Sequence, residues 1–288
     1  MILGYEKIDL HMHTTISDGT DTPEEILEKV CAEKIDLFSV TDHDAIAVGI
    51  SMPEILTKGD PAFIRGVEFS CRNDGGKYHI LGYGYDPDVP GIREVVDKGH
   101  SFRMGKTRAR VDFLKEAFGF EFPQEDLKEL FARANPGKPH IAAMMVRLGY
   151  AETIEIAMRD FIDRKKFTNV YISPEEAIEG ILRSHGIPVL AHPVYGSGNE
   201  LIMGEELEER IRYLMDLGLA GLECYYSGYS HKMQKQVLSL AEKYDLYVTA
   251  GSDYHGGNKL VPLADHGLTD TSQAPEGMKR FLQDVTIF

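Results

Sequence analysis

The sequence predicts an α/β fold, a parallel barrel that is closed or nearly closed and carries an inserted helical subdomain. Seven strand-like runs alternate mostly with amphipathic helical segments, which is the pattern of βα units around a parallel sheet. The stretch between residues 87 and 173 interrupts this alternation and shows only helical patterns. We therefore expect residues 1–86 and 174–288 to form the barrel and residues 87–173 to form an inserted all-helical subdomain.

The first barrel segment begins with the strand KIDLHM and the helix TPEEILEKVCAEKI, in which Thr22 and Glu25 form a capping box. The strands DLFSVTDHD, PAFIRGVEFS and KYHILGYGY follow. Only RNDGGK separates the last two, which is too short for a crossover helix and predicts a hairpin. A register that pairs Glu68 with His79 would centre its turn on Asn73–Asp74.

The insertion and the second barrel segment follow in order. The insertion contains four helical patterns, GIREVVDKGHSFRMGKTRARVDFLKEAFG, PQEDLKELFARA, PHIAAMMVRLG and ETIEIAMRDFIDRKK, with Gly and Pro at the joints. A second capping box, Ser173 with Glu176, begins the helix SPEEAIEGILRSHG. The strands IPVLAHP, AGLECYY and LYVTAGSDYH complete the barrel, with helices between them.

The composition limits the possible functions. A chain of 288 residues with 43% hydrophobic and 27% charged residues is typical of a soluble globular protein. A net charge of −15 argues against binding to long duplex nucleic acid, and no apolar run is long enough for a membrane span. Three widely spaced cysteines and the absence of a signal-like start predict reduced thiols and a cytoplasmic location. The sequence does not predict an oligomeric state.

Histidines and acids gather at the predicted strand ends. Alternation along KIDLHMH places His11 and His13 on one face of a strand, where a metal ion would satisfy both imidazoles. Two surface histidines on an edge strand are the alternative. Singly, His79, His192 and Asp253 have ordinary explanations, but together the set suits a cluster of two or three ions bridged by Glu68. The candidate metal ligands are His11, His13, Asp18, His43, Glu68, His79, His192, Asp253 and His255.

HMH followed by Asp18, then TDHD, Glu68, YHILGY, AHP and SDYH, in this order, resembles the PHP family (polymerase and histidinol phosphatase). The resemblance covers both barrel segments and implies a distorted seven-stranded barrel with a metal cluster. It implies one site of His11, His13, Glu68 and Asp253, a second of Glu68, His79 and His192, and a third of Asp18, His43 and His255.

The insertion resembles that of a bacterial subgroup of stand-alone PHP phosphoesterases labelled as linked to a tryptophan operon. GKPHIAAMMV, the arginine-rich helix before it, and GLECYY followed by His231 are similar, which implies Lys138, His140 and His231 as substrate-binding residues. Such relatives act on nucleotide 3′,5′-bisphosphates, nucleoside monophosphates or 5′-phosphorylated RNA, and others open cyclic sugar phosphates. The chain departs from them at RKKFTNVYIS, where a Gly-Lys-Pro turn is expected.

These patterns predict a metal-dependent phosphoesterase that acts on small phosphorylated metabolites. We expect a metal-bound hydroxide near Glu68 and Asp253 as nucleophile, with His192 as the third catalytic residue. Ligands of nitrogen and oxygen without sulfur permit Mn, Zn or Fe. The alternatives are a C–N hydrolase of the amidohydrolase type, a cyclic sugar-phosphate phosphodiesterase, and a nucleotide sensor without turnover.

A basic helix lies in the insertion. Arg103, Lys106 and Arg110 are spaced three and four residues apart, so they share one helix face. A second phosphate on the substrate would need such partners; the alternative is a solvated face. We therefore expect a small phosphorylated partner, a nucleotide or a short oligonucleotide.

Overall fold

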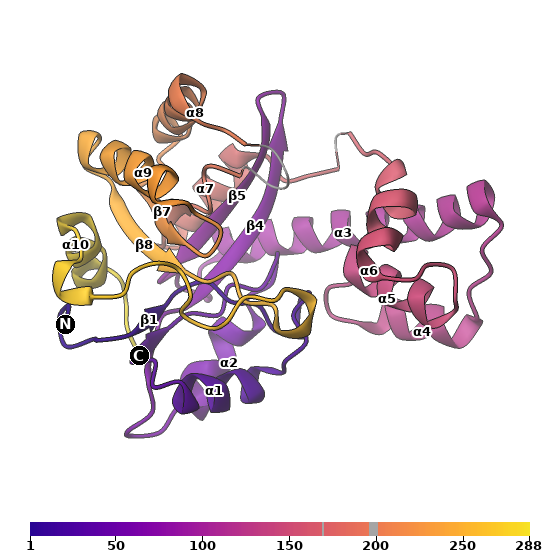
Figure 1. The fold of residues 1–288 in the computed structure, drawn as a ribbon, viewed down its shortest axis with the longest axis horizontal. Coiled ribbons are helices and arrows are strands. Elements are labelled where there is room, and N and C mark those ends of the chain that lie inside the picture. The colour runs from indigo at the N-terminus through magenta and orange to yellow at the C-terminus, as the bar shows by residue number, and fades with distance from the viewer. Residues whose placement is uncertain (169, 196–200) are drawn as a thin grey trace.

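The structure is a computed structural model that describes residues 1–168, 170–195 and 201–288. In these ranges, eight strands form two sheets that helices cover on the outside (Figure 1). The strands are β1 (Ile8–Asp9), β2 (Leu37–Phe38), β3 (Ala62–Phe63), β4 (Gly66–Asn73), β5 (Gly76–Tyr83), β6 (Ile187–Leu190), β7 (Gly221–Tyr226) and β8 (Tyr247–Gly251).

The helices fall into three groups along the chain. Those between the first strands are α1 (Pro23–Ala32) and α2 (Ala47–Ile55). Those of the predicted insertion are α3 (Pro90–Phe118), α4 (Gln124–Ala132), α5 (Lys138–Arg147), α6 (Ile154–Ile156) and the turns η1 (Ala157–Phe161) and η2 (Ile162–Arg164). Those of the last part are α7 (Pro174–Arg183), α8 (Gly204–Asp216), α9 (His231–Lys243), η3 (Gly256–Asn258), η4 (Thr271–Gln273) and α10 (Glu276–Asp284).

The two sheets are joined by backbone contacts on both sides. The order is β1-β2-β3 in the parallel sheet and β4-β5-β6-β7-β8 in the other, where β5 is antiparallel to both of its neighbours. On one side, Leu10 N donates to Ala250 O at 2.9 Å; on the other, Asp44 N donates to Glu68 O at 2.9 Å. The ends of strands from both sheets therefore converge on one region.

The predicted mixed α/β class is confirmed, but the count of seven strands in one barrel is wrong. The run PAFIRGVEFS, expected as a single strand, divides into β3 and β4, which belong to different sheets. Arg65 lies at the division and donates through Nε to Gly49 O at 3.0 Å, which holds the bend. The chain end then pairs with β3, since Phe63 N donates to Phe288 O at 3.0 Å and Phe288 N to Phe63 O at 2.9 Å.

Both predicted capping boxes are confirmed. Thr22 Oγ1 accepts from Glu25 N at 3.2 Å while the Glu25 carboxylate accepts from Thr22 N at 2.8 Å, at the start of α1. Ser173 and Glu176 repeat this exchange at the start of α7, at 3.3 and 3.0 Å. Each cap is worth about 1 kcal/mol and fixes where its helix begins.

The hairpin between β4 and β5 is confirmed, but its predicted register is wrong. Ser70, not Glu68, pairs with His79, and Asn73 pairs with Gly76 around the two-residue turn Asp74–Gly75. An Asp-Gly pair favours a two-residue turn at this position rather than one residue earlier. A slip of two residues leaves every side chain on its face, so Glu68 still contacts His79 diagonally, at 2.7 Å from Oε1 to Nδ1.

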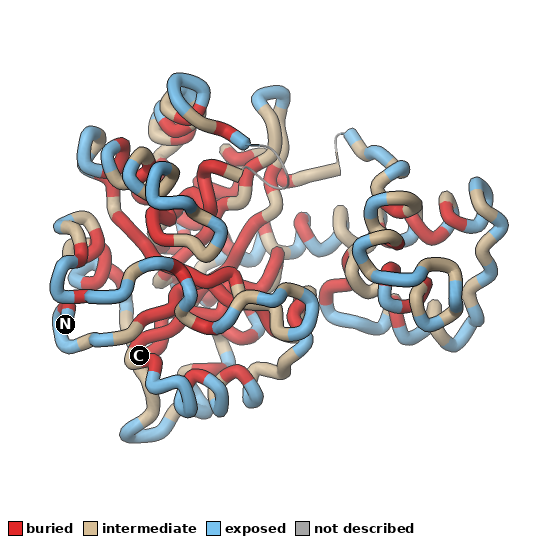
Figure 2. The backbone as a smooth tube through the Cα atoms, in the orientation of Figure 1, coloured by how far each residue is buried: buried red, intermediate tan, exposed pale blue. Residues whose placement is uncertain are grey.

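The helices α3 to α6 extend to one side of the sheets (Figure 1). They surround a buried cluster of their own, which includes Leu114, Ile141 and Met145 and is separate from the two clusters around the sheets (Figure 2). The helix α3 belongs to both parts, because it packs against α7 and also contributes Leu114 to the separate cluster. Its basic face is thereby held beside the ends of the strands.

No helix in the described ranges has both the length and the apolar character that crossing a bilayer would require. The three cysteines are unpaired, and two of them, Cys71 and Cys224, are buried. The cytoplasmic location expected from their spacing stays a prediction.

Candidate metal centre

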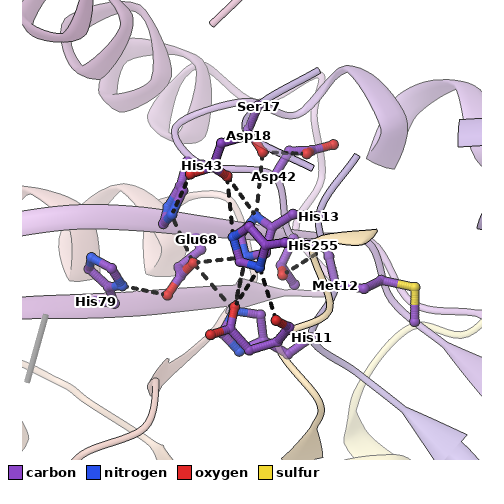
Figure 3. A network of polar contacts seen from close by, with 12 residues as sticks. His11, Met12, His13, Ser17, Asp18, Asp42, His43, Glu68, His79 and His255 are labelled. Carbon is purple, nitrogen blue, oxygen red and sulfur yellow. Dashed lines mark hydrogen bonds and ion pairs between the residues drawn. The ribbon is translucent and has the colours of Figure 1, made fainter. Parts of the chain in front are cut away.

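The carboxylate of Glu68 lies at the centre of a buried group of histidines (Figure 3). Its Oε2 is within 3.3 Å of ring nitrogens of three histidines, and its Oε1 is within 3.2 Å of two more. The first three are His11, His13 and His43; the other two are His79 and His192. One carboxylate thus faces five imidazoles.

Each strand except β3 contributes to this group or to the residues that support it. His11 and His13 follow β1, and both are buried with their Nε2 atoms 3.2 Å apart, as the alternation of the strand predicts. His43 follows β2, and His192 follows β6. Glu68 and His79 lie within β4 and β5, and Asp253 and His255 follow β8.

Two aspartates complete the group from opposite sides. Asp253 Oδ1 lies 3.4 Å from His11 Nε2 and 3.3 Å from His13 Nε2. Asp18 Oδ1 lies 3.3 Å from His255 Nε2, and Asp18 Oδ2 lies 3.9 Å from His43 Nε2. All nine predicted ligands are therefore in one region, although they come from six separate places along the chain.

Potential ligand atoms converge in three sets, in each of which they lie within 4.8 Å of one another. The sets are His11, His13, Glu68 and Asp253; His13, Asp18, His43 and His255; and His43, Glu68 and His79. The first is the set implied for one site by the family resemblance. The second adds His13 to the expected third site. In the remaining one, His43 joins Glu68 and His79, while His192 Nε2 lies 3.3 Å from His79 Nδ1.

The arrangement fits divalent metal ions. The Nε2 atoms of His11 and His13 point toward each other and toward two carboxylates, so a cation between them would satisfy all four groups. Asp18 Oδ1 and His43 Nδ1 are buried without a hydrogen-bond partner in the described structure, although each has an ionisable neighbour. Nitrogen and oxygen donors without sulfur are suitable for Mn, Zn or Fe.

The close packing of acids and imidazoles in this buried group shifts their pKa values. Burial would lower the pKa of His13, but hydrogen bonds to Asp253 and Glu68 outweigh it and raise the pKa to about 9. Burial lowers the pKa of His43 to about 3. Burial would raise the pKa of Glu68, but His79 and His43 hold it well below its usual value. Because coordinating imidazoles must be neutral, His13 would have to lose its proton to hold an ion, so metal binding would weaken as the pH falls.

A cavity of about 270 Å³ opens beside the histidines. Asp18, His43 and His79 form its inner end, and eight of its lining residues are Lys or Arg. All three residues of the predicted basic face line it: Arg103, Lys106 and Arg110.

The other predicted substrate residues divide between the cavity and the surface. Lys138 lines the cavity and contacts Asp163 at 2.9 Å. His140 Nδ1 accepts from Gly137 N at 3.0 Å, and the ring borders a different, shallower hollow. His231 is exposed at the first position of α9. The structure thus places Lys138 at the cavity, and His140 and His231 elsewhere.

Curated relatives resemble the chain over most of its length, although no family model matches it. A phosphoribosyl 1,2-cyclic phosphate 1,2-diphosphodiesterase of Eggerthella lenta is 29% identical over 266 residues, 88% of this chain and 96% of the relative. A 5′-3′ exoribonuclease of Salmonella typhimurium, Rnm, is 27% identical, covering 93% and 94%. A 3′,5′-nucleoside bisphosphate phosphatase of Chromobacterium violaceum is 27% identical, covering 86% and 87%.

Solved structures agree in fold. A structure from Bifidobacterium adolescentis, described as a putative metal-dependent phosphoesterase, has a TM-score of 0.79 and 27% identity over 97% of this chain and 96% of that chain. In sequence and fold the chain is thus similar to phosphoesterases over most of its length. Another structure, from Chromobacterium violaceum with bound sulfate, is described as an amidohydrolase and has a TM-score of 0.77 and 26% identity, covering 88% and 89%.

One buried acid of this centre, Glu223, is not among the ligands that the sequence predicted. It is buried in β7, where Oε1 lies 2.9 Å from His11 Nδ1 and Oε2 accepts from His192 N at 2.8 Å. It thereby fixes the ring of His11 and the backbone of His192, whose φ of +29° is unusual for a residue with a side chain. An acid inside the otherwise apolar strand AGLECYY was the signal that could have identified it.

We predict that Glu223→Gln weakens metal binding by about 10–100-fold, the usual cost of losing a carboxylate behind a ligating histidine. The amide keeps the shape of the side chain but not the charge that orients the His11 ring. Metal affinity, measured by competition with a chromogenic chelator, checks this.

The matched control is Glu242→Gln, which changes an exposed acid on α9. Equal metal affinities in Glu223→Gln, the control and the unmodified protein would show that Glu223 does not orient the centre.

Proposed function

We propose that this protein hydrolyses phosphate esters of nucleotides, with a nucleoside 3′,5′-bisphosphate, a nucleoside monophosphate or a 5′-phosphorylated oligonucleotide as substrate. The observation that carries the proposal is the direct contact between the metal-ligand cluster and a cationic cavity: Asp18, His43 and His79 belong to both. A phosphate at the metals and a second one in the cavity would each meet positive charge. The names of the relatives, a bisphosphate phosphatase and exoribonucleases, support this class.

We propose two or three Mn, Zn or Fe ions, held by the three converging sets with His192 as a further ligand beside His79 and Glu68. Bound ions of this kind supply an activated water at neutral pH and neutralise charge on the phosphoryl group. The protein residues fix where this happens. Glu68 presents one oxygen to each side of the cluster, so it sets the separation of the ligands around it.

Glu68, Asp253 and His192 are the proposed catalytic residues. Asp253 turns Oδ1 toward His11 and His13 and Oδ2 toward Tyr226 OH, at 3.0 Å. Its φ of +57° shows that the backbone is held in an unfavourable conformation to aim this carboxylate. His192 Nε2 lies 3.2 Å from Glu68 Oε1, so this nitrogen is the one that would bind an ion beside the reacting phosphate.

The second phosphate would lie against α3 and α5, which supports residues 87–173 as a subdomain that caps the substrate. Arg110 is buried, and its Nε has no hydrogen-bond partner among the described residues, a costly state that an anion would relieve. Arg103 is held by Asp44 Oδ2, at 2.7 Å from Nη2. Lys106 has no carboxylate within 4.0 Å in the described structure.

The reaction class is tested by a phosphate-release assay on protein loaded with Mn or Zn. We expect release from adenosine 3′,5′-bisphosphate, AMP or a short 5′-phosphorylated RNA, and loss of release with a chelator. A cyclic ribose phosphate and a set of amides complete the panel. Turnover of amides alone would favour the amidohydrolase alternative, and nucleotide binding without any turnover would favour a sensor.

The role of the second-phosphate contacts is tested by Arg110→Ala. We expect KM for adenosine 3′,5′-bisphosphate to rise by roughly 10-fold or more, the scale of one charge-assisted contact. KM for p-nitrophenyl phosphate should change much less, because that ester has no second phosphate.

Arg108→Ala is the matched control, since Arg108 is exposed on the same helix and contacts the ring of Phe131. Similar small changes in KM for both esters in Arg110→Ala would favour the alternative, that the basic face is only solvated.

Lys106 predicts a pH dependence. Burial, reinforced by the Arg103 charge, lowers the pKa of Lys106 to about 7. Only the protonated amine attracts phosphate, so binding of the bisphosphate should weaken as the pH rises through neutrality. We expect the ratio of KM in the unmodified protein to KM in Lys106→Arg to rise several-fold between about pH 6 and about pH 8, because Arg stays charged. Titration of the metal ligands and of the substrate cancels in this ratio, so a constant ratio contradicts the assignment.

A further inference from the structure

The cavity holds more positive charge than a second phosphate requires. Of its eight Lys and Arg residues, Arg103 and Lys138 contact carboxylates. The other six have no carboxylate within 4.0 Å among the described residues. Lys106 and Arg110 belong to the second-phosphate position, which leaves four cations with neither a carboxylate partner nor an assigned phosphate. These four are Arg72, Lys77, Lys165 and Lys166.

Two of the four face each other across the β4–β5 hairpin. Arg72 on β4 pairs directly with Lys77 on β5, and both side chains line the cavity. Like charges at directly opposed positions destabilise a sheet. An anion between or above them would remove this cost, so the pair itself indicates a ligand of negative charge.

The other two cations lie on the segment that follows η2. This segment is fastened to the hairpin, because Arg72 N donates to Ile172 O at 2.9 Å and Arg72 Nη1 donates to Phe167 O at 2.9 Å. Lys165 and Lys166 therefore form the wall of the cavity next to Arg72.

Aromatic rings lie between the second-phosphate position and these cations. The centre of the Tyr171 ring is 3.9 Å from Lys106 Nζ and 5.7 Å from Arg72 Cζ. The ring of Phe167 is 4.9 Å from Arg110 Cζ, while its own carbonyl accepts from Arg72. Cations alternating with aromatic rings match the alternation of phosphates and bases in a single strand, where bases stack on such rings.

We propose that Arg72, Lys77, Lys165 and Lys166, with the rings of Phe167 and Tyr171, form a distal subsite for a third phosphate and its nucleoside in single-stranded nucleic acid. The inference rests on the proposed function and extends it. A mononucleotide bisphosphate would occupy only the metals and the second-phosphate position. A longer single strand would continue between the hairpin and the side chains of Lys165, Lys166 and Tyr171.

Two ligands distinguish the distal subsite from the second-phosphate position. Adenosine 3′,5′-bisphosphate carries two phosphates, and diadenylate phosphorylated at both ends carries three, whichever end lies at the metals. We expect the metal-loaded protein to bind diadenylate about 10-fold more tightly, the scale of one charge-assisted contact. The double variant Lys165→Gln, Lys166→Gln should abolish this advantage and reduce the salt dependence of diadenylate binding by about one ion. Its KM for adenosine 3′,5′-bisphosphate should change less than about threefold, since that ligand has no third phosphate to contact these lysines.

The matched control is Lys232→Gln, Lys235→Gln, which removes two exposed charges from α9 and should keep the preference for diadenylate. Equal affinity of the unmodified protein for the two ligands would overturn the distal subsite, as would equal loss of both ligands in the Lys165, Lys166 variant. Either result leaves hydrolysis of adenosine 3′,5′-bisphosphate intact. Absence of hydrolysis in the unmodified, metal-loaded protein would instead refute the proposed function.

Discussion

The structure depends on one buried carboxylate, that of Glu68, which faces five imidazoles at 3.3 Å or less. A carboxylate and several imidazoles removed from water are expensive unless strong partners compensate them. Both sheets supply members of the group, so their meeting edges are fixed by the same contacts that build the site. The unfavourable backbone at His192 and Asp253 is understandable on this basis, because the surrounding strands hold these residues in place for their ligand geometry.

A second constraint is the separation of charge. The chain carries −15 overall, yet the cavity beside the metal-ligand cluster contains eight basic residues and two aspartates. Such a local positive field attracts anionic substrates while the acidic surroundings disfavour long duplexes. The inserted helices make this arrangement possible, since α3 extends from α7 to a separate buried cluster and carries Arg103, Lys106 and Arg110 along the way.

The parts of the site that the sequence predicted are those governed by local rules. Alternation along a strand placed His11 and His13 together, and Ser and Thr caps located α1 and α7. The parts that it could not predict depend on tertiary pairing. The observed register of the β4–β5 hairpin differs by two residues from the predicted one. Both registers place the same side chains on each face of the sheet, so the sequence pattern does not distinguish them. Phe167 and Ile172 meet the hairpin through hydrogen bonds with Arg72, for which no local pattern exists.

The central claim is that the imidazoles around Glu68 are metal ligands. Anomalous diffraction at the Mn edge from crystals grown with Mn tests it most directly. We expect anomalous peaks on both sides of the Glu68 carboxylate, one between His11, His13 and Asp253 and another toward His79 and His192. Well-ordered side chains with no anomalous peak among them, at a Mn concentration that supports phosphate release, would contradict it.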